Sequence, residues 1–363
     1  MNIIAIRSKI EVGGAGKLLV AELTELSSRG HSIVLITERC DYCRELEDAG
    51  VTIIFSEGLV YGRRRIRTTF RGIQQIKKVL INYPCDVLYG YEVYTTLLAY
   101  FVIQLLRKKH IKIVSLVLGN GRELAKKLAP FPLIVMSESH KRELIEKGVK
   151  ASKMIVNYPT TIDSNYAREF ERSSSLFRKE IGVPDDAFLI GSVYCGHKGA
   201  ENYADLCDEC LNAYDNIHYV FVGDSNRFDE YRKYFSSKPY YQRCHFVGIR
   251  HDMPNIMNSL DILSHILALD DYETFGMVIV EAMYFGKPVV ATHNGAVPEI
   301  VKDQINGYLI NNNDKAAYFK AVSEIVKNAD ALEELRNAAF RFAHERFTLA
   351  EHVKNLERIF NSI

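Results

Sequence analysis

Short apolar runs alternate with helical patterns along both halves of this chain, and this alternation constrains its fold more than any other feature. In the first half the apolar runs are Ile3–Ile6, Ile33–Ile36, Thr52–Phe55, Val87–Tyr89, Ile111–Leu118 and Leu133–Met136. In the second half they are Phe188–Val193, Tyr219–Val222, His245–Val247, Ile262–Ile266 and Pro288–Ala291. Continuous apolar runs are typical of parallel strands that are buried on both faces by helices. The sequence therefore predicts an α/β fold of two doubly wound domains, which bind ligands at the carboxyl ends of their strands.

The two strand-and-helix arrays meet in segment 157–184, which contains a run of three serines at 173–175. We therefore expect an N-terminal domain over residues 1–160 and a second domain over residues 161–345. Residues 346–363 contain an amphipathic helical pattern. Its apolar positions are Leu349, Val353, Leu356 and Ile359 or Phe360. A chain of 363 residues is long enough for two separate cores.

The composition indicates a globular protein, with 47% hydrophobic and 25% charged residues. A net charge of +1 argues against general nucleic-acid binding but leaves room for local basic patches. The first residues lack the apolar core of a secretory signal. The longest apolar stretch, Tyr94–Leu106, is too short to span a bilayer. We therefore expect a cytoplasmic protein without membrane-spanning helices.

Metal-binding patterns are weak in this sequence. Two C-x-x-C pairs occur, Cys40/Cys43 and Cys207/Cys210, but they lie far apart and each falls in or beside a helical pattern. Structural thiols are therefore favoured over a zinc or redox site. The sequence contains no Asp-x-Asp and no His/Cys/Asp cluster with metal-ligand spacing, so we expect no metal site.

Two acids eight positions apart, Glu273 and Glu281, flank the start of an apolar segment. The run 277–283 is apolar nearly all round, which predicts a buried helix that stops near Gly286. A buried carboxylate without a partner costs several kcal/mol, so Glu281 should have one, and a pair of ribose hydroxyls would suit it. Glu273 comes just before the helix, beside amides that form an anion site. These features together indicate a pocket for a nucleotide sugar.

Two glycine-containing loops follow predicted strands. Gly13 and Gly14 open a helix, where glycines let the main chain approach an anion closely, although a plain tight turn explains them equally well. Lys198 lies in the second loop and could place an ammonium against a diphosphate, although a solvated loop lysine has the same pattern. Segment 246–253 ends a strand and starts a helix, and its main chain could contact a nucleobase.

Basic residues cluster at Arg63, Arg64, Arg65 and Arg67, with apolar residues interleaved in the segment that follows. One interpretation is contact with a phosphorylated acceptor or with an anionic membrane face. The alternative is a solvated charged helix, which the same pattern fits slightly better.

Taken in order, these motifs resemble those of the GT-B glycosyltransferases in the large retaining group called family 4, or glycosyl transferases group 1. The strongest is E-x7-E, from Glu273 to Glu281, within ETFGMVIVEAMYFGKPVVAT. The supporting motifs are GGAGK at 13–17, SRGHSIVLIT at 28–37, VMSESHKRELIEKG at 135–148, GHKG at 196–199, YVFVGD at 219–224, HFVGIRHDMPNIMNSLDIL at 245–263 and NGAVPEIVKDQINGYLI at 294–310. The resemblance covers nearly the whole chain. It implies two Rossmann-like domains facing a central cleft, with the helix in 346–363 crossing back to the N-terminal domain.

The resemblance also implies roles for individual residues. Glu273 would hold hydroxyls of the donor sugar, Glu281 would bind the ribose, and Lys198 would neutralise the diphosphate, which makes Glu273 and Lys198 the catalytic candidates. The other donor-binding residues that it implies are His197, Ile249, Arg250, Thr274, Phe275, Gly276 and Met277, with Gly13 and Gly14 approaching from the opposite domain.

Two positions depart from the family pattern. Where the family commonly has a histidine after a first-domain strand, this chain reads Leu118-Gly119-Asn120, and Asn120 becomes a candidate residue on the acceptor side. Where the family commonly has an arginine six residues before the lysine, this chain has Ser192. His197, if protonated, would replace part of that charge.

The expected function is transfer of a sugar, with retained anomeric configuration and without a metal or other cofactor, from a nucleoside-diphosphate sugar. A UDP-sugar is a more probable donor than a GDP-sugar. The acceptor would be a glycan, a lipid-linked molecule or a phosphorylated molecule, in bacterial cell-surface polysaccharide or glycoconjugate synthesis, with peripheral contact to the inner face of the plasma membrane. The alternatives are a non-catalytic relative that binds or regulates a partner, and another GT-B activity such as a nucleotide-sugar epimerase or a phosphorylase.

Overall fold

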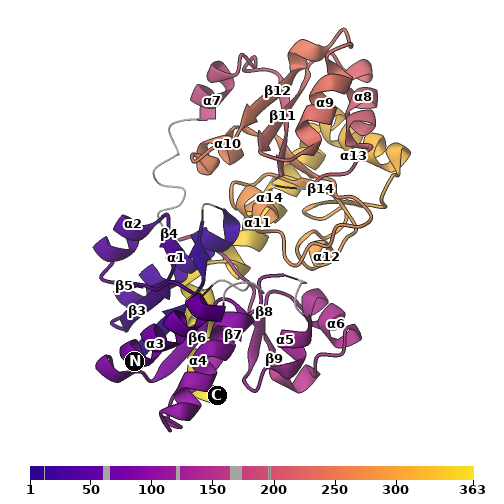
Figure 1. The fold of residues 1–363 in the computed structure, drawn as a ribbon. Coiled ribbons are helices and arrows are strands. Elements are labelled where there is room, and N and C mark those ends of the chain that lie inside the picture. The colour runs from indigo at the N-terminus through magenta and orange to yellow at the C-terminus, as the bar shows by residue number, and fades with distance from the viewer. Residues whose placement is uncertain (12, 60–65, 120–122, 164–173, 195, 197) are drawn as a thin grey trace. The chain divides into compact units, whose positions relative to one another are not determined.

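The computed structural model describes residues 1–11, 13–59, 66–119, 123–163, 174–194, 196 and 198–363 (Figure 1). It divides into two compact units. Unit 1 comprises Met1–Thr161 together with Leu349–Ile363, and unit 2 comprises Ile162–Thr348.

In the described part of unit 1, seven parallel strands form one sheet in the order β5-β3-β1-β6-β7-β8-β9. The strands are β1 (Asn2–Ile6), β3 (Ser32–Thr37), β5 (Thr52–Phe55), β6 (Val87–Gly90), β7 (Lys112–Leu116), β8 (Leu133–Val135) and β9 (Met154–Val156). A separate short pair consists of β2 (Lys9–Ile10) and β4 (Arg39–Cys40). The central strands are buried along most of their length, which explains their unbroken apolar runs.

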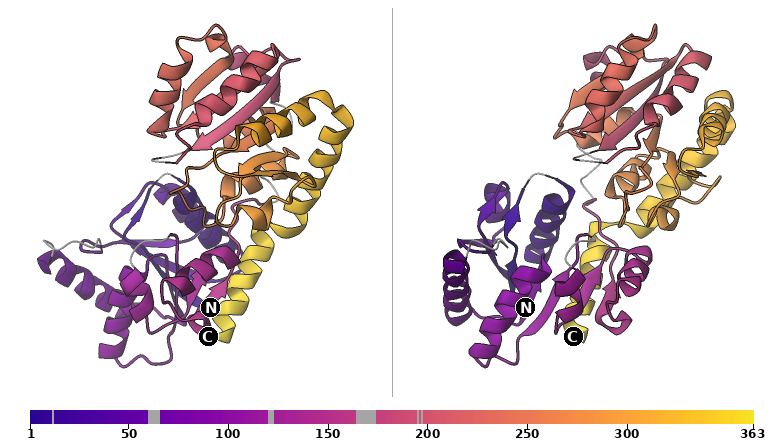
Figure 2. Two further views of the ribbon diagram at one scale, coloured as in Figure 1. Left: turned by 90° about the vertical axis from the view of Figure 1, so that its right-hand side faces the viewer. Right: turned by 45° about the vertical axis from the view of Figure 1, so that its right-hand side comes forward.

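Helices pack around this sheet (Figure 2). They are α1 (Gly14–Ser28), α2 (Cys43–Asp48), α3 (Ile66–Asn82), α4 (Val93–Leu105), α5 (Glu123–Leu128), α6 (Glu138–Glu146), the 3-10 turn η1 (Ala151–Lys153) and α15 (Leu349–Ser362). Ser137 caps α6 by accepting the His140 N–H at 2.9 Å. Helix α15, yellow in the figures, packs against α1.

A buried polar cluster joins α15 to the rest of unit 1. Glu22 on α1 is fully buried, and its carboxylate lies 2.7 Å from His352 Nε2 on α15. The hydroxyl of Tyr89 donates to the same carboxylate at 3.0 Å, and that of Tyr91 donates to it as well. His352 Nδ1 donates to the Tyr158 carbonyl oxygen at 2.7 Å. The side-chain polar atoms of this buried pair therefore have hydrogen-bond partners, as buried polar groups normally do.

Unit 2 contains six described parallel strands in the order β12-β11-β10-β13-β14-β15. They are β10 (Phe188–Tyr194), β11 (Ile217–Gly223), β12 (Cys244–Gly248), β13 (Ile262–His265), β14 (Val289–Thr292) and β15 (Gly307–Ile310). The chain runs outward from β10 in one direction and then returns to β13 on its other side. This reversal of strand order is the switch point at which doubly wound sheets bind ligands.

The helices of unit 2 are α7 (Ser174–Glu180), α8 (Tyr203–Ala213), α9 (Arg227–Phe235), η2 (Tyr241–Arg243), α10 (Met253–Ser259), α11 (Met277–Tyr284), α12 (Val297–Ile300), α13 (Lys315–Lys327) and α14 (Ala329–Arg346). Side-chain caps begin the last two: Asp314 accepts the Ala317 N–H at 2.9 Å, and Asn328 accepts the Ala331 N–H at 3.1 Å.

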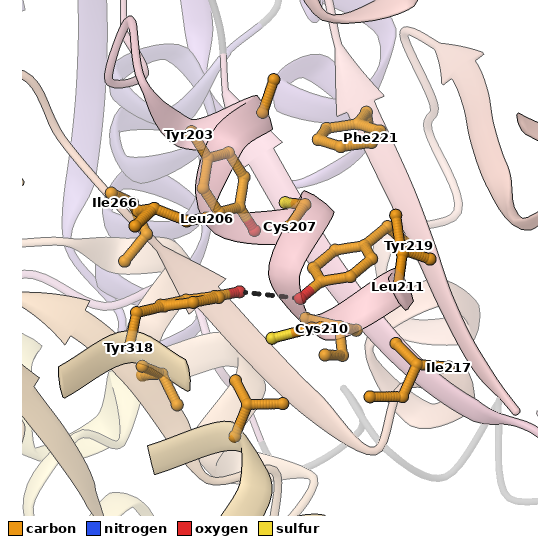
Figure 3. Packing of buried hydrophobic residues seen from close by; sticks show 14 of the residues in the cluster. Tyr203, Leu206, Cys207, Cys210, Leu211, Ile217, Tyr219, Phe221, Ile266 and Tyr318 are labelled. Atoms are coloured by element: carbon orange, nitrogen blue, oxygen red, sulfur yellow. Dashed lines mark hydrogen bonds between the residues drawn. The ribbon is translucent and has the colours of Figure 1, made fainter. Parts of the chain in front are cut away.

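The core of unit 2 is rich in aromatic and thiol side chains (Figure 3). The hydroxyls of Tyr219 and Tyr318 meet at 3.2 Å beside Cys207 and Cys210, which are both fully buried free thiols. Burial raises the pKa of both thiols, that of Cys210 to about 12. These cysteines therefore act as core side chains, because a thiol held in the neutral form is a poor ligand and nucleophile.

The predicted fold class is confirmed, since both units are parallel α/β sheets wound with helices. The sequence analysis missed the short strands β2, β4, β9 and β15. Within the described ranges, no helix is both long and apolar enough to cross a membrane.

Candidate donor site in unit 2

The predicted catalytic pair lies at the switch point of unit 2. Strand β10 ends at Tyr194, and the loop after it carries Lys198. Strand β13 ends at His265, and the segment after it carries Glu273. Because β10 and β13 are neighbouring parallel strands, both segments leave the same edge of the sheet. Strand order thus brings together residues that are far apart in the sequence.

Glu273 is paired with two nitrogen donors. Lys198 Nζ lies 2.8 Å from Glu273 Oε2, and His265 Nε2 lies 3.2 Å from the same oxygen. The side chains of Glu273 and His265 are 7% and 2% exposed, whereas that of Lys198 is 34% exposed. A buried carboxylate is therefore held by one buried donor and by one donor that reaches solvent.

The electrostatics of Glu273 follow from this pairing. Burial by itself raises the pKa of the carboxyl, but the His265 hydrogen bond and the charge of Lys198 oppose it and lower the pKa to about 2. Glu273 is thus ionised at neutral pH. An ionised carboxylate at a ligand site is a strong acceptor for sugar hydroxyls.

The loop after β14 holds the main chain of Glu273. The Glu273 N–H donates to Asn294 Oδ1 at 2.9 Å, and the Ala296 N–H donates to the Glu273 carbonyl oxygen at 2.8 Å. Asn294 Nδ2 also donates to the Asp271 carbonyl oxygen at 2.7 Å. Gly295 fits closely, because a Cβ there would lie 2.1 Å from the Glu273 carbonyl oxygen. These contacts hold the main chain of Glu273 in one position beside the edge of the sheet.

Helix α11 begins directly after this segment. Gly276 has φ 96°, a left-handed conformation that glycine adopts readily, and it turns the chain into the helix. Phe275 is fully buried and its ring lies 5.6 Å from that of Phe347, which anchors the turn. Thr274 and Met277 are half-buried at the same turn. In the first turn of α11 the Ile279 N–H donates to the Gly276 carbonyl oxygen at 3.0 Å, and the amides of Met277 and Val278 at the helix N-terminus favour an anion.

The burial expected for the two acids is reversed in the structure. Glu281 is only half-buried on α11, and Glu273 is the deeply buried acid. Met277, Val278 and Glu281 are all half-buried, and positions separated by three or four residues share one face of a helix. The predicted buried helix is confirmed for most of α11, but one face is half-buried and Glu281 lies on it. The predicted ribose contact of Glu281 stays a prediction.

The residues predicted near the base follow β12. Ile249 is 60% exposed. Arg250 forms ion pairs with Glu180 and with Asp252, the latter at 2.8 Å, and its guanidinium lies over the Phe177 ring at 5.5 Å. Because the Arg250 side chain is engaged in this way, only main-chain contacts to a ligand fit the prediction.

Other predicted residues belong to unit 1 or lie outside the described residues. Gly13, with φ 145°, and Gly14 open α1 in unit 1. Arg67 belongs to α3. His197, Arg63, Arg64, Arg65 and Asn120 lie outside the described residues. Contact of the arginine cluster with a membrane or an acceptor therefore stays a prediction.

Ser192, which stands where the family commonly has arginine, is fully buried. Its hydroxyl lies 2.6 Å from that of Tyr203 and donates to the Ser264 carbonyl oxygen at 3.1 Å. The Ser192 side chain is thus part of the hydrogen-bonded core of unit 2. In the parts of the chain that the structure describes, no group of three or more His, Cys, Asp or Glu side chains could hold a metal ion.

Sequence reasoning missed two residues of the site, His265 and Asn294. The only signal for His265 was its place at the end of an apolar run, where a strand meets a ligand edge. Asn294 begins the motif NGAVPEIV, but nothing in the sequence indicated that its side chain would bind the main chain of Glu273.

Comparison with known proteins finds glycosyltransferases. Residues 176–342 match the profile of the family described as glycosyl transferases group 1. The chain is 23% identical over 372 residues to N-acetyl-alpha-D-glucosaminyl L-malate synthase of Bacillus anthracis, covering 97% of this chain and 94% of the relative. It is 23% identical over 187 residues to the O-antigen biosynthesis glycosyltransferase WclY of Escherichia coli, covering 52% of this chain and 50% of the relative.

Among solved structures, HepE of Anabaena in complex with UDP-glucose superposes with a TM-score of 0.85 and 19% identity, covering 100% of both chains. This likeness agrees with the predicted GT-B fold class. The narrower assignment to family 4 stays a prediction. The profile match over residues 176–342 and the relative that extends along the chain make this protein similar to the glycosyl transferases of group 1.

Proposed function

We propose that this protein transfers a sugar from a UDP-sugar to a hydroxyl group of a glycan, a lipid-linked molecule or a phosphorylated molecule. The observation that carries the proposal is the pairing of Lys198 with the buried Glu273 at the switch point of unit 2. A half-exposed ammonium, a carboxylate acceptor and the first turn of α11 together suit a sugar attached to a diphosphate. The likeness to HepE, whose structure contains UDP-glucose, supports uridine as the base.

The proposed reaction retains the anomeric configuration. The bond between the anomeric carbon and the diphosphate oxygen breaks, and the acceptor oxygen forms its bond on the same face of the sugar. The acceptor proton passes to an oxygen of the departing diphosphate, so no separate protein base is needed. Lys198 and the α11 amides stabilise the charge that grows on the diphosphate, while Glu273 accepts hydrogen bonds from the sugar.

We also propose that the reaction needs no metal ion. Metal-bridged sugar transferases commonly hold the diphosphate through an Asp-x-Asp sequence, and this chain contains none. In its place, the cationic side chain of Lys198 offsets the charge of the diphosphate. Activity that survives EDTA would support this part of the proposal, whereas activity restored only by a divalent cation would contradict it.

A role in cell-surface polysaccharide or glycoconjugate synthesis is the biological setting that we propose. The names of the relatives support it, since one is an O-antigen biosynthesis glycosyltransferase and another is an N-acetyl-alpha-D-glucosaminyl L-malate synthase. The acceptors of such relatives differ, so the acceptor of this chain has to be found by direct assay.

The first experiment is a thermal-shift panel of UDP, GDP and ADP and of their glucose, galactose and N-acetylglucosamine conjugates. Ligands that bind the folded chain raise its melting temperature by mass action. The best sugar nucleotide is then incubated with the protein, and ¹H NMR follows release or transfer of the sugar and its anomeric configuration. A retained anomer supports the proposal. An inverted anomer, a change of sugar configuration without transfer, or no binding of any nucleotide would refute it.

A further inference from the structure

His265 is held rigidly at the end of β13. Its side chain is 2% exposed, and its ring centroid lies 5.6 Å from that of Tyr194. The next residue, Ile266, donates its N–H to the Tyr194 hydroxyl at 2.5 Å, and its carbonyl oxygen accepts from the Ala200 N–H at 3.1 Å. Because the main chain and the ring are both held in place, His265 Nε2 points at Glu273 in one fixed geometry.

Lys198 and His265 bind the same oxygen of Glu273. Both contacts end on Oε2, at 2.8 Å and 3.2 Å. No other described residue donates a hydrogen bond to the Glu273 carboxylate, so Oε1 keeps its full capacity to accept. The carboxylate is thus held by one oxygen and open to a ligand at the other.

The two donors differ in how far their side chains are exposed to solvent. Lys198 reaches Glu273 with a flexible stem that is 34% exposed, whereas the His265 side chain is nearly inaccessible. A diphosphate that binds Lys198 would compete with Glu273 for the ammonium. A buried carboxylate that loses every partner is strongly destabilised, and His265 is the donor that stays in place.

The second ring nitrogen argues against a purely structural histidine. His265 Nδ1 is buried and has no hydrogen-bond partner among the residues that the structure describes. An unsatisfied buried polar atom destabilises the folded state, and a leucine would fill similar space without that cost. The benefit of histidine at this position therefore lies in its Nε2–H.

We propose that His265 is a positioning residue that keeps Glu273 oriented by Oε2 when the donor diphosphate draws Lys198 away, so that Oε1 meets the donor sugar. The part that concerns the sugar rests on the proposed function. The part that concerns the hold on Glu273 does not, because it can be measured without any ligand.

The ligand-free test uses ¹³C NMR of glutamate carboxyls, with Glu273 assigned by its loss in Glu273→Gln. Lys198→Met imitates removal of the ammonium. The Glu273 pKa should rise in Lys198→Met and should rise further, by about one unit or more, when His265→Leu is added. Equal pKa values in the single and the double variant would overturn the proposal.

The ligand test compares UDP with the UDP-sugar that binds wild type most tightly, by calorimetry. His265→Leu should weaken the UDP-sugar about tenfold or more and leave UDP within about twofold, because only the sugar contacts Glu273. His265→Gln retains an N–H donor and should restore much of the loss. A merely structural role would weaken both ligands equally and would not distinguish leucine from glutamine.

His218→Leu is the matched control. His218 is also a buried histidine of the unit 2 sheet, on β11, and its Nδ1 lies 3.0 Å from His245 Nε2. It should leave the ratio of UDP-sugar affinity to UDP affinity unchanged. If wild type binds UDP but His265→Leu keeps that ratio, the positioning role fails and the proposed function stands. If wild type binds no nucleotide, the proposed function fails. The carboxyl titration then still tests whether His265 holds the Glu273 carboxylate in place.

Discussion

Replacing Glu273 by glutamine should remove a pH-dependent part of the stability of unit 2. The carboxyl has a pKa of about 2 in the folded chain, against a usual value of 4.5. At about 1.4 kcal/mol per pKa unit, this difference corresponds to about 3 kcal/mol at neutral pH. Because the folded pKa is the lower one, this stability is present above pH 4.5 and is lost as the pH falls through 2. By pH 3, about 2 kcal/mol of it should be gone.

The measurement is urea unfolding of wild type and Glu273→Gln at several pH values from 7 to 3. Two-unit chains can unfold in separate steps, so the unit 2 transition has to be identified. Labelling of the fully buried Cys207 and Cys210, with a thiol reagent that works at acid pH, reports it. The advantage of wild type over the variant should shrink by about 2 kcal/mol between pH 7 and pH 3.

Glu209→Gln is the control, because it makes the same chemical change at an exposed position on α8 in the same unit. Its unfolding profile should follow that of wild type across the pH range. Parallel profiles for wild type and Glu273→Gln, within about 0.5 kcal/mol, would refute the reasoning. They would mean that the two donors do not hold this carboxyl ionised.

Three further outcomes are expected. Lys198→Met should weaken UDP about tenfold or more in calorimetry, because it removes the ammonium proposed to meet the diphosphate, and a change below about twofold would contradict that role. His352→Leu removes the 2.7 Å contact to the buried Glu22 and should destabilise unit 1 by about 3–5 kcal/mol in urea unfolding, with little effect if the contact is dispensable. Gly295→Ala would place a Cβ 2.1 Å from the Glu273 carbonyl oxygen, so it should lower both the melting temperature and the affinity for UDP-sugars, and wild-type values for both would show that the loop can yield.

The sequence allowed the strands and the main acid to be predicted for physical reasons that are local. Buried parallel strands are apolar on both faces, so runs such as Ile3–Ile6 stand out without knowledge of their neighbours. The short edge strand β15 (Gly307–Ile310) is half-buried in its middle and carries no such signal. The apolar runs of β5 and β12 were recognised as well, although these strands are only partly buried.

The partners of Glu273 could not be predicted in the same way. Asn294 reaches Glu273 because β13 and β14 lie side by side, and strand order is not written in local periodicity. His265 lies only eight residues before Glu273, but the path of the segment between them is irregular and has no periodic pattern. The burial of Glu281 was misjudged because an apolar composition says little about which face of a short helix is covered. The sequence allowed the types of residue in the site to be predicted, whereas the contacts between them depended on the topology of the sheet.

The arrangement of unit 1 has a consequence for synthesis in the cell. A ribosome releases residues 349–363 only after it has made all of 162–348, yet unit 1 needs both Met1–Thr161 and Leu349–Ile363. Until α15 emerges, the nascent first unit carries Glu22 without His352 and an uncovered side of α1. The later-made unit 2 can therefore finish folding before the earlier-made one. A product interrupted before residue 349 would leave its first unit open to chaperones and proteases.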